Sequence, residues 1–296
     1  MDMLVQGWLG QALAVVLGLC VGSFANVAVY RLPRSGLSVM RPARSFCTSC
    51  RKTLSWSDNV PVVSWLALGR RCRYCGTPIP WRYPAVEILV AVLFALVWWR
   101  NPPVDGGAAS RLAVYLVLTA CCVVISAIDL EHTIIPDAIT LPGLALGLLV
   151  SLALPLLHEG HAAYRAASPN TSSMIAGLLG ALAGGGSLWL VGQVGNIFLR
   201  RRIEAAGVDD AMGLGDVKWM AFTGTVLGAE SALLAILAAC FIGALVGIVL
   251  KVVASIRKRD DVVGIPFGPF LSVGVVVELL WPGSTWDVFQ RILPVS

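Results

Sequence analysis

The feature that most constrains this chain is a succession of apolar runs, several of them near membrane length. A helix needs about 20 apolar residues to cross a bilayer core, and none of the runs alternates as a barrel strand would. Of the 296 residues, 57% are hydrophobic and 13% are charged, which is more apolar than a soluble domain requires. The sequence therefore predicts an all-α polytopic membrane protein. We expect about eight transmembrane helices, near residues 8–30, 84–99, 111–128, 138–156, 173–199, 217–228, 230–253 and 263–282.

Charge distribution decides the number and direction of the spans, because the sixth run is short for a crossing. With eight spans and both termini outside, all but four of the 22 Lys and Arg face the inside, as the positive-inside rule requires. The exceptions are Arg100, Arg111, Arg165 and Arg291. A seven-span chain would expel the basic cluster at 257–259, so we prefer eight. No removable signal peptide is predicted, because the first run lacks a basic residue before it and a cleavage site after it.

One long segment, residues 31–83, interrupts the apolar pattern. It carries ten Arg and Lys against the single acid Asp58, and it lies on the predicted inner side. Such a charge attracts anionic membrane lipids, which we favour over nucleic acid as its partner. We therefore divide the chain into a first transmembrane helix (1–30), a basic cytosolic domain (31–83) and a seven-helix membrane domain (84–296).

Two CxxC pairs lie inside this basic segment. The four ligands are Cys47, Cys50, Cys72 and Cys75, at a spacing typical of structural four-cysteine zinc sites. A pair of disulfides is the alternative, but persistent disulfides are rare on the reducing side of a membrane. Four protein ligands would leave the metal no open position, so we expect a structural zinc that holds this small domain together.

Two carboxylates stand apart from the other acids near the membrane. Asp129 closes the third predicted helix, and Asp216 opens the sixth after Gly213 and Gly215. The charge-derived topology places both at the inner face, where two adjacent carboxylates share a proton and can act as a general acid and a general base. Each could instead be an ordinary helix-end residue. The glycines favour close approach of an extended segment.

Taken together, these motifs resemble the bacterial type IV prepilin peptidases, which belong to the GxGD aspartic proteases. The likeness runs over nearly the whole chain. The matching segments are GSFANV (22–27) with RLP (31–33), the two CxxC pairs with NVP (59–61) and SWL (64–66), RYP (82–84) with Glu87, Asp129 with IPD (135–137), AMGLGDVK (211–218) and IPFGPF (265–270).

The resemblance implies that Asp129 and Asp216 are the catalytic pair, supported by Gly213, Gly215, Lys218, Pro136 and Asp137. It implies cleavage of prepilins and secretion pseudopilins after a short basic leader, at the cytosolic face of the inner membrane. It also implies N-methylation of the new N-terminus from S-adenosylmethionine. Gly22, Asn26, Arg31 and Glu87 are the candidates for the methyl-donor site.

Three other functions remain open from the sequence. A peptidase without methyltransferase activity would lack only the second reaction. An ion-coupled transporter would use the acids to bind a cation, although no internal repeat is visible and both acids lie at one face. A non-catalytic scaffold would need the cysteines and not the aspartates.

Overall fold

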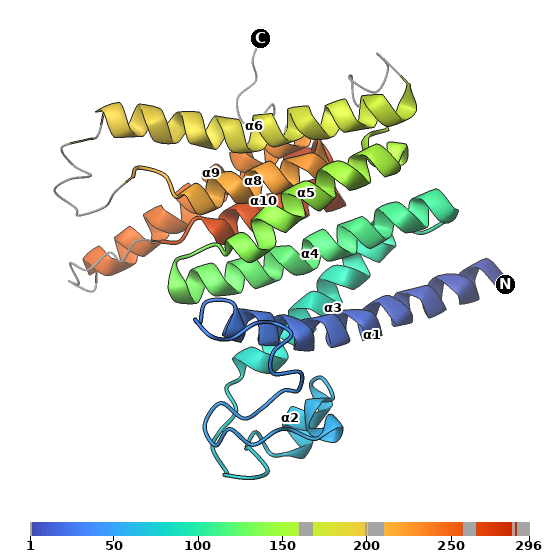
Figure 1. Ribbon diagram of the computed structural model, residues 1–296, viewed down its shortest axis with the longest axis vertical. Coiled ribbons are helices and arrows are strands. Elements are labelled where there is room, and N and C mark those ends of the chain that lie inside the picture. The colour runs from blue at the N-terminus through green and yellow to red at the C-terminus, as the bar shows by residue number, and fades with distance from the viewer. Residues whose placement is uncertain are drawn as a thin grey trace. The chain divides into compact units, whose positions relative to one another are not determined.

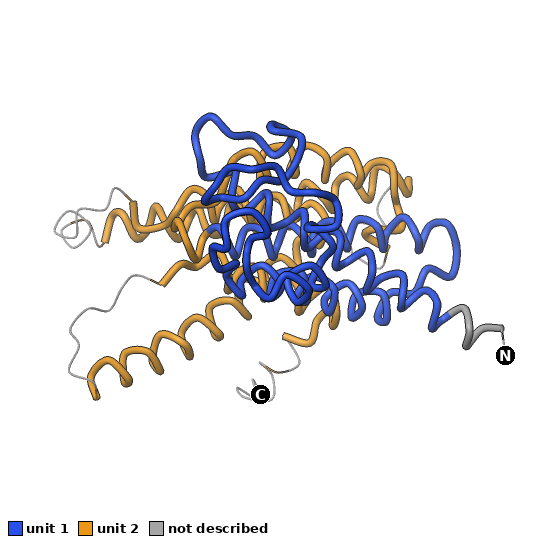
Figure 2. Tube along the Cα trace, turned by 90° about the horizontal axis from the view of Figure 1, so that it is seen from below, with its two compact units in different colours: residues 1–128 blue, residues 129–296 orange. Residues whose placement is uncertain are grey.

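The computed structural model describes residues 2–159, 168–198, 200, 210–256, 265–285 and 288. The predicted basic cluster at 257–259 lies outside these residues. The chain divides into two compact units, residues 1–128 and 129–296 (Figure 2). The described part contains α-helices and short 3-10 turns with no β-strand, which confirms the all-α fold class.

In the first unit, two long helices pack against each other in opposite directions. They are α1 (Asp2–Arg31) and α3 (Arg82–Arg100). Two hydrogen bonds show the antiparallel arrangement. Near the start of α1, the Gln11 side chain donates to the carbonyl of Ala95, and near its end Asn26 donates to the carbonyl of Tyr83, at the start of α3. Between the helices lies the segment 32–81, with the 3-10 turn η1 (Trp56–Asn59) and the short α2 (Val63–Ala67). Helix α4 (Gly106–His132) begins in this unit and ends in the second.

The second unit is a bundle built around a short, buried helix. Its elements are α5 (Asp137–Ala153), the 3-10 turn η2 (Pro155–His158), α6 (Pro169–Phe198), α8 (Leu214–Leu227), α9 (Ala229–Ile256) and α10 (Gly268–Leu280). Helix α8 contacts α5, α6, α9 and α10 (Figure 1). Beyond Lys218, α8 is largely apolar and almost entirely buried, so this helix is stable only when other helices enclose it.

Small residues allow α6 and α8 to approach closely. A Cβ atom at Gly180 would lie 1.9 Å from the carbonyl oxygen of Gly224, and one at Gly184 would lie 2.4 Å from that of Met220. Such backbone contact is the usual role of small residues between membrane helices. These glycines on α6 therefore serve helix packing.

Each of the eight predicted apolar runs forms one helix, but they differ in length. Among the described residues, five helices are long and apolar enough to cross a membrane, namely α1, α3, α4, α6 and α9. Helices α5 and α10 are apolar but shorter. Helices α8 and α9 are separate because Gly228, between them, has a φ of 80° that a helix cannot include.

Candidate active site

Asp129 and Asp216 meet in the second unit, although they are far apart in sequence. Asp129 lies in the last turn of α4, and Asp216 lies in the first turn of α8. Asp129 is buried, with 6% of its surface exposed, and Asp216 is half-buried. The Ile135 side chain lies beside Gly215, which precedes Asp216, and beside Gly268, whose N–H bonds Asp129. The two acids therefore border the same region of this unit.

The two carboxylates have different partners. The backbone N–H of Gly268 donates to Asp129 Oδ2 at 2.9 Å. Asp216 Oδ1 is buried and has no hydrogen-bond partner within the described part of the chain. Such a group is costly to leave unpaired.

Gly213 and Gly215 keep the space around Asp216 free of side chains. A Cβ at Gly213 would lie 3.1 Å from Asp216 Oδ2, and one at Gly215 would lie 2.9 Å from Ile135 Cβ. Gly213 is also the N-cap of α8, and its carbonyl accepts the N–H of Asp216 at 3.1 Å. Larger residues here would crowd the carboxylate or displace the 133–136 segment.

The predicted supporting residues join α5 to α8. Pro136 is the N-cap of α5, Asp137 is in its first turn, and Lys218 Nζ is hydrogen-bonded to Asp137 Oδ1. Both side chains are partly exposed, so this ion pair contributes little stability. The ion pair does hold the start of α5 beside the first turn of α8, because Lys218 lies two residues beyond Asp216 on that helix.

The four predicted metal ligands form one cluster in the first unit. The sulfur atoms of Cys47, Cys50, Cys72 and Cys75 all lie within 4.8 Å of one another, and these cysteines are free thiols. The two CxxC turns are built alike: the Cys47 carbonyl accepts the N–H of Arg51, and the Cys72 carbonyl accepts that of Gly76. A metal ion fits this donor set, because four sulfurs at such distances can bind it tetrahedrally.

The four thiols do not have the same acidity. The side chain and backbone of Thr77 bond the Cys75 thiol and lower its pKa to about 6. The backbone of Lys52 also bonds the Cys50 thiol, but burial and the bonds to Cys47 and Cys75 outweigh this and raise its pKa to about 11.

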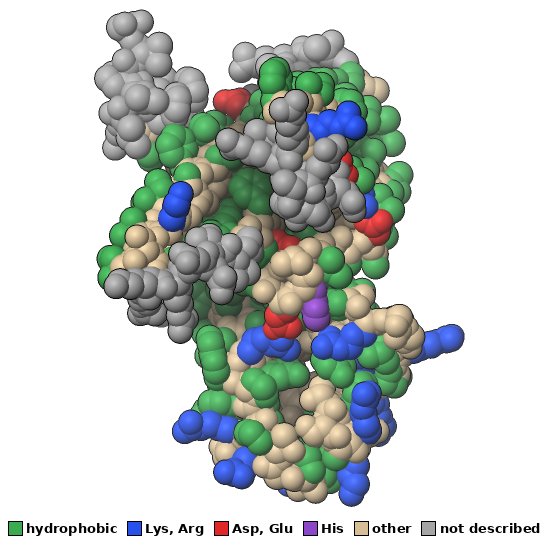
Figure 3. All heavy atoms as spheres, turned by 90° about the vertical axis from the view of Figure 1, so that its left-hand side faces the viewer, with side chains coloured by type: hydrophobic (Ala, Val, Ile, Leu, Met, Phe, Trp, Pro, Cys, Tyr) green, Lys and Arg blue, Asp and Glu red, His purple; other side chains and the backbone are tan. Residues whose placement is uncertain are grey.

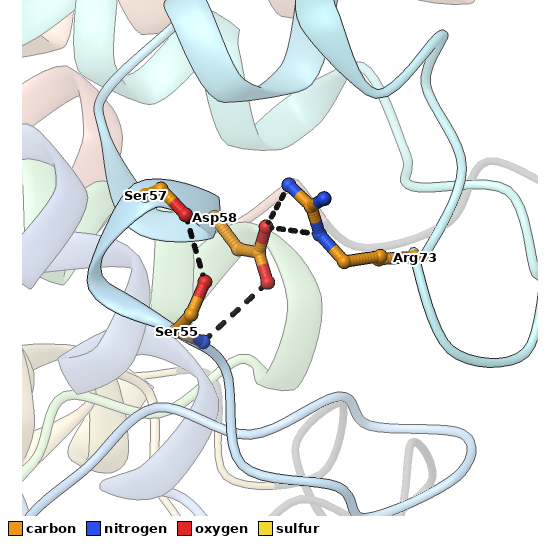
Figure 4. A network of polar contacts seen from close by, with 4 residues as sticks. All are labelled: Ser55, Ser57, Asp58 and Arg73. Carbon is orange, nitrogen blue, oxygen red and sulfur yellow. Dashed lines mark hydrogen bonds and ion pairs between the residues drawn. The ribbon is translucent and has the colours of Figure 1, made fainter.

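An ion pair fastens the second CxxC turn to the turn η1 (Figure 4). Arg73, between the second pair of cysteines, approaches Asp58 Oδ1 through Nε at 2.8 Å and Nη2 at 2.7 Å. Burial of the Asp58 carboxyl opposes its ionisation, but bonds from Arg73 and Ser55 outweigh this and hold its pKa below the usual value. Sequence reasoning gave Asp58 no role, although it is the only acid of the segment.

A cavity of about 170 Å³ lies in the first unit beside this cluster. Its wall includes Asn26, Glu87 and the aromatic residues Tyr30, Phe46, Trp65 and Tyr83. Asn26 Oδ1 is buried without a hydrogen-bond partner in the described part of the chain. Glu87 Oε2 accepts the N–H of Val62 at 2.7 Å. The cavity thus presents an unpaired amide oxygen and a buried carboxylate among aromatic rings.

The other two candidates for the methyl-donor site have structural contacts. A Cβ at Gly22 would lie 2.6 Å from Glu87 Cα, so the glycine allows α1 to pack on α3. The Arg31 guanidinium donates to the carbonyls of Ser38, Val39, Pro42 and Arg44 and stacks over Phe46. Arg31 therefore shapes the loop that forms one side of the cavity.

Two family models match the chain. Residues 16–101 match the Bacterial Peptidase A24 N-terminal domain, and residues 116–248 match the Type IV leader peptidase family. These ranges contain the cysteine cluster and both aspartates.

Curated relatives match over almost the full length. A protein of Myxococcus xanthus named prepilin leader peptidase/N-methyltransferase is 39% identical, over 98% of this chain and 79% of its own. Proteins of the same name from Pseudomonas putida and Aeromonas hydrophila are 35% and 31% identical, over 95% and 94% of this chain and 94% and 92% of their own. No solved structure shows significant similarity to the chain.

Proposed function

Because the chain belongs to the type IV leader peptidase family, we propose that it is a prepilin leader peptidase that uses Asp129 and Asp216 as its catalytic pair. The observation that carries this proposal is the meeting of the two acids, one buried and bonded by Gly268, the other with an unpaired buried oxygen. Neither acid is held by a cationic side chain, as a structural carboxylate would be, among the contacts of the described residues.

The reaction follows from general acid–base chemistry. One carboxylate removes a proton from a water molecule, and the resulting hydroxide attacks the scissile carbonyl carbon. The protonated partner then gives its proton to the departing amine nitrogen, and the carbon–nitrogen bond breaks. Each turnover consumes one water and returns the pair to a singly protonated state.

The remaining predicted residues position the pair and the substrate. The Asp137–Lys218 ion pair fixes the start of α5 against α8, and Pro136 is the N-cap of α5. Gly213 and Gly215 leave room for an extended peptide beside Asp216. The substrates are prepilins and secretion pseudopilins, cut after a short basic leader.

The reaction takes place at the cytosolic face of the bacterial inner membrane, with both chain termini outside. This orientation is supported by the distribution of Lys and Arg in the sequence. Figure 3 shows Lys and Arg side chains gathered over the region of the 31–83 segment. Trp56 and Trp81 are 85% and 75% exposed there. Basic and aromatic side chains together favour contact with an anionic lipid headgroup layer.

The four cysteines hold a structural zinc. A closed set of four thiolates leaves no position for a substrate, so the ion stabilises the 31–83 segment and takes no part in the cleavage.

The chain also methylates the new N-terminus, and S-adenosylmethionine, when bound, supplies the methyl group. The residues that line the cavity of the first unit have the chemistry to bind this donor. The unpaired Asn26 Oδ1 can accept from its hydroxyl or amino groups, the Glu87 carboxylate can attract its positive charge, and the aromatic rings can stack on its base. Gly22 and Arg31 hold the walls of the cavity in place.

Replacing either polar group should weaken donor binding. We expect Glu87→Gln and Asn26→Ala each to raise the dissociation constant for S-adenosylmethionine about tenfold, because each removes one polar partner. Glu87→Gln keeps an oxygen for the N–H of Val62, so the fold is preserved. Calorimetric titration of the purified protein measures this, with Asp216→Asn as the control that binds normally. Unchanged affinity in both variants would place the donor elsewhere.

Mass spectrometry of one pilin N-terminus, from cells with and without this protein, tests the proposed function as a whole. We expect a pilin that has lost its leader and gained one methyl group only when the protein is present. A pilin that has lost its leader but carries no methyl group would show that the protein is a peptidase without methyltransferase activity. A full-length leader in both samples would contradict the proposal.

A further inference from the structure

The first turn of α10 leaves one backbone N–H group available. Pro269 has no N–H, and the N–H groups of Phe270 and Leu271 both donate to the carbonyl of Phe267. The remaining amide is that of Gly268, which donates to Asp129 Oδ2. Amides at a helix start carry partial positive charge and favour an anionic acceptor. The first turn of α10 thus has one free backbone donor, the Gly268 N–H, and it bonds the Asp129 carboxylate.

Space also requires glycine at this position. A Cβ at residue 268 would lie 2.7 Å from Asp129 Oδ2, 3.2 Å from its Cγ and 3.3 Å from Ile135 Cδ1. Gly268 has a helical backbone that any residue can adopt, so conformational freedom does not explain the glycine. Ile135 in turn contacts the position of Gly215, next to Asp216. The Ile135 side chain therefore lies between Gly215 and Gly268, the two glycines next to the catalytic carboxylates.

We propose that Gly268 is a positioning residue of the active site: its backbone N–H fixes the Asp129 carboxylate in its reacting orientation, and its missing side chain leaves that carboxylate its space. This inference rests on the proposed function of the aspartate pair. It adds a contribution from α10, so that the site is assembled from α4, α8 and α10. The hydrogen bond makes the two acids unequal, because Asp129 receives a backbone donor and Asp216 Oδ1 has no partner among the described residues.

Kinetics of Gly268→Ala test the positioning role. A misplaced catalytic group lowers the rate of the chemical step, so we expect kcat for prepilin cleavage to fall about tenfold to a hundredfold. KM should change less than about twofold, because the substitution acts on the orientation of Asp129, which affects the chemical step rather than substrate binding. The matched control is Gly243→Ala on α9, whose Cβ would meet Phe270 of the same turn at an ordinary 3.5 Å. It should leave kcat and KM unchanged. A Gly268→Ala enzyme with normal kcat would overturn the proposal.

A double-mutant cycle on thermal stability tests the same contact without any substrate. Gly268→Ala should lower the melting temperature in the wild-type background and lower it much less in Asp129→Ala, where the obstructing carboxylate is absent. Equal losses in the two backgrounds would show that residue 268 does not act on Asp129, and would sink the inference. If the cycle shows coupling while the wild type cleaves no prepilin, the proposed function fails and the contact stands.

Discussion

Asp129→Asn and Asp216→Asn are each expected to reduce cleavage of a prepilin leader by about 10³-fold or more, with the protein still inserted in the membrane. An amide cannot exchange a proton as a carboxyl group does, so either substitution leaves the pair without its acid or without its base. The side chains keep their shape, and the N–H of Gly268 can still donate to an amide oxygen at position 129. The measurement is the initial rate of leader release from a purified prepilin.

Non-additivity gives this prediction a second measurement. Because the two acids act as one unit, the double variant should be no slower than the slower single variant. Asp105→Asn is the matched control: the Asp105 carboxylate only accepts the N–H of Ala108 at the start of α4, and its loss should leave cleavage unchanged. Wild-type cleavage by either single variant would show that the pair is wrong.

The sequence was informative wherever a local pattern has a physical cause. Apolar runs mark helices because a bilayer-spanning backbone must satisfy its own hydrogen bonds, and each predicted run forms a helix. The CxxC spacing fixes a turn that presents two thiols, so the cluster of Cys47, Cys50, Cys72 and Cys75 followed from the spacing. Helix ends were harder to predict. Helix α4 continues past the apolar run to His132, because polar residues near an interface do not end a helix.

Contacts between distant segments could not be predicted from such patterns. Gly268 lies 139 residues from Asp129, and nothing local indicates which carboxylate its amide will meet. Val62 is a second case: it holds a φ of 61°, which a β-branched residue rarely adopts, while its N–H bonds Glu87. Strain of this kind persists only when tertiary contacts impose it.

The short length of α8 explains how the chain can place Asp216 at the start of a buried helix. Helix α8 has 14 residues, contacts α5, α6, α9 and α10, and carries Asp216 in its first turn. Irregular backbone near membrane depth is tolerated where it is buried in protein or lines a water-filled space. Because α6 and α8 touch backbone to backbone at Gly180 and Gly224, packing against α6 helps to fix the position of α8 and of Asp216 in its first turn.

Loss of one cysteine ligand should remove the zinc ion and unfold the 31–83 segment. We expect the purified wild-type protein to contain about one zinc ion per chain and Cys72→Ser to contain almost none, because three thiolates bind the ion far less tightly. The 31–83 segment, held by short turns, η1 and α2, is too small to stay folded on its own core. It should become sensitive to protease, whereas the membrane helices stay resistant.

Cys240→Ser is the matched control for this prediction, since Cys240 lies on α9 outside the cluster. It should keep its zinc and its protease resistance. In Cys72→Ser we expect weaker donor binding, because Cys72 and Phe46 line the same cavity as Glu87. Leader cleavage should persist at a reduced rate, since Asp129 and Asp216 belong to the other compact unit. A wild-type protein free of metal, or a Cys72→Ser protein with full zinc content, would contradict the assignment.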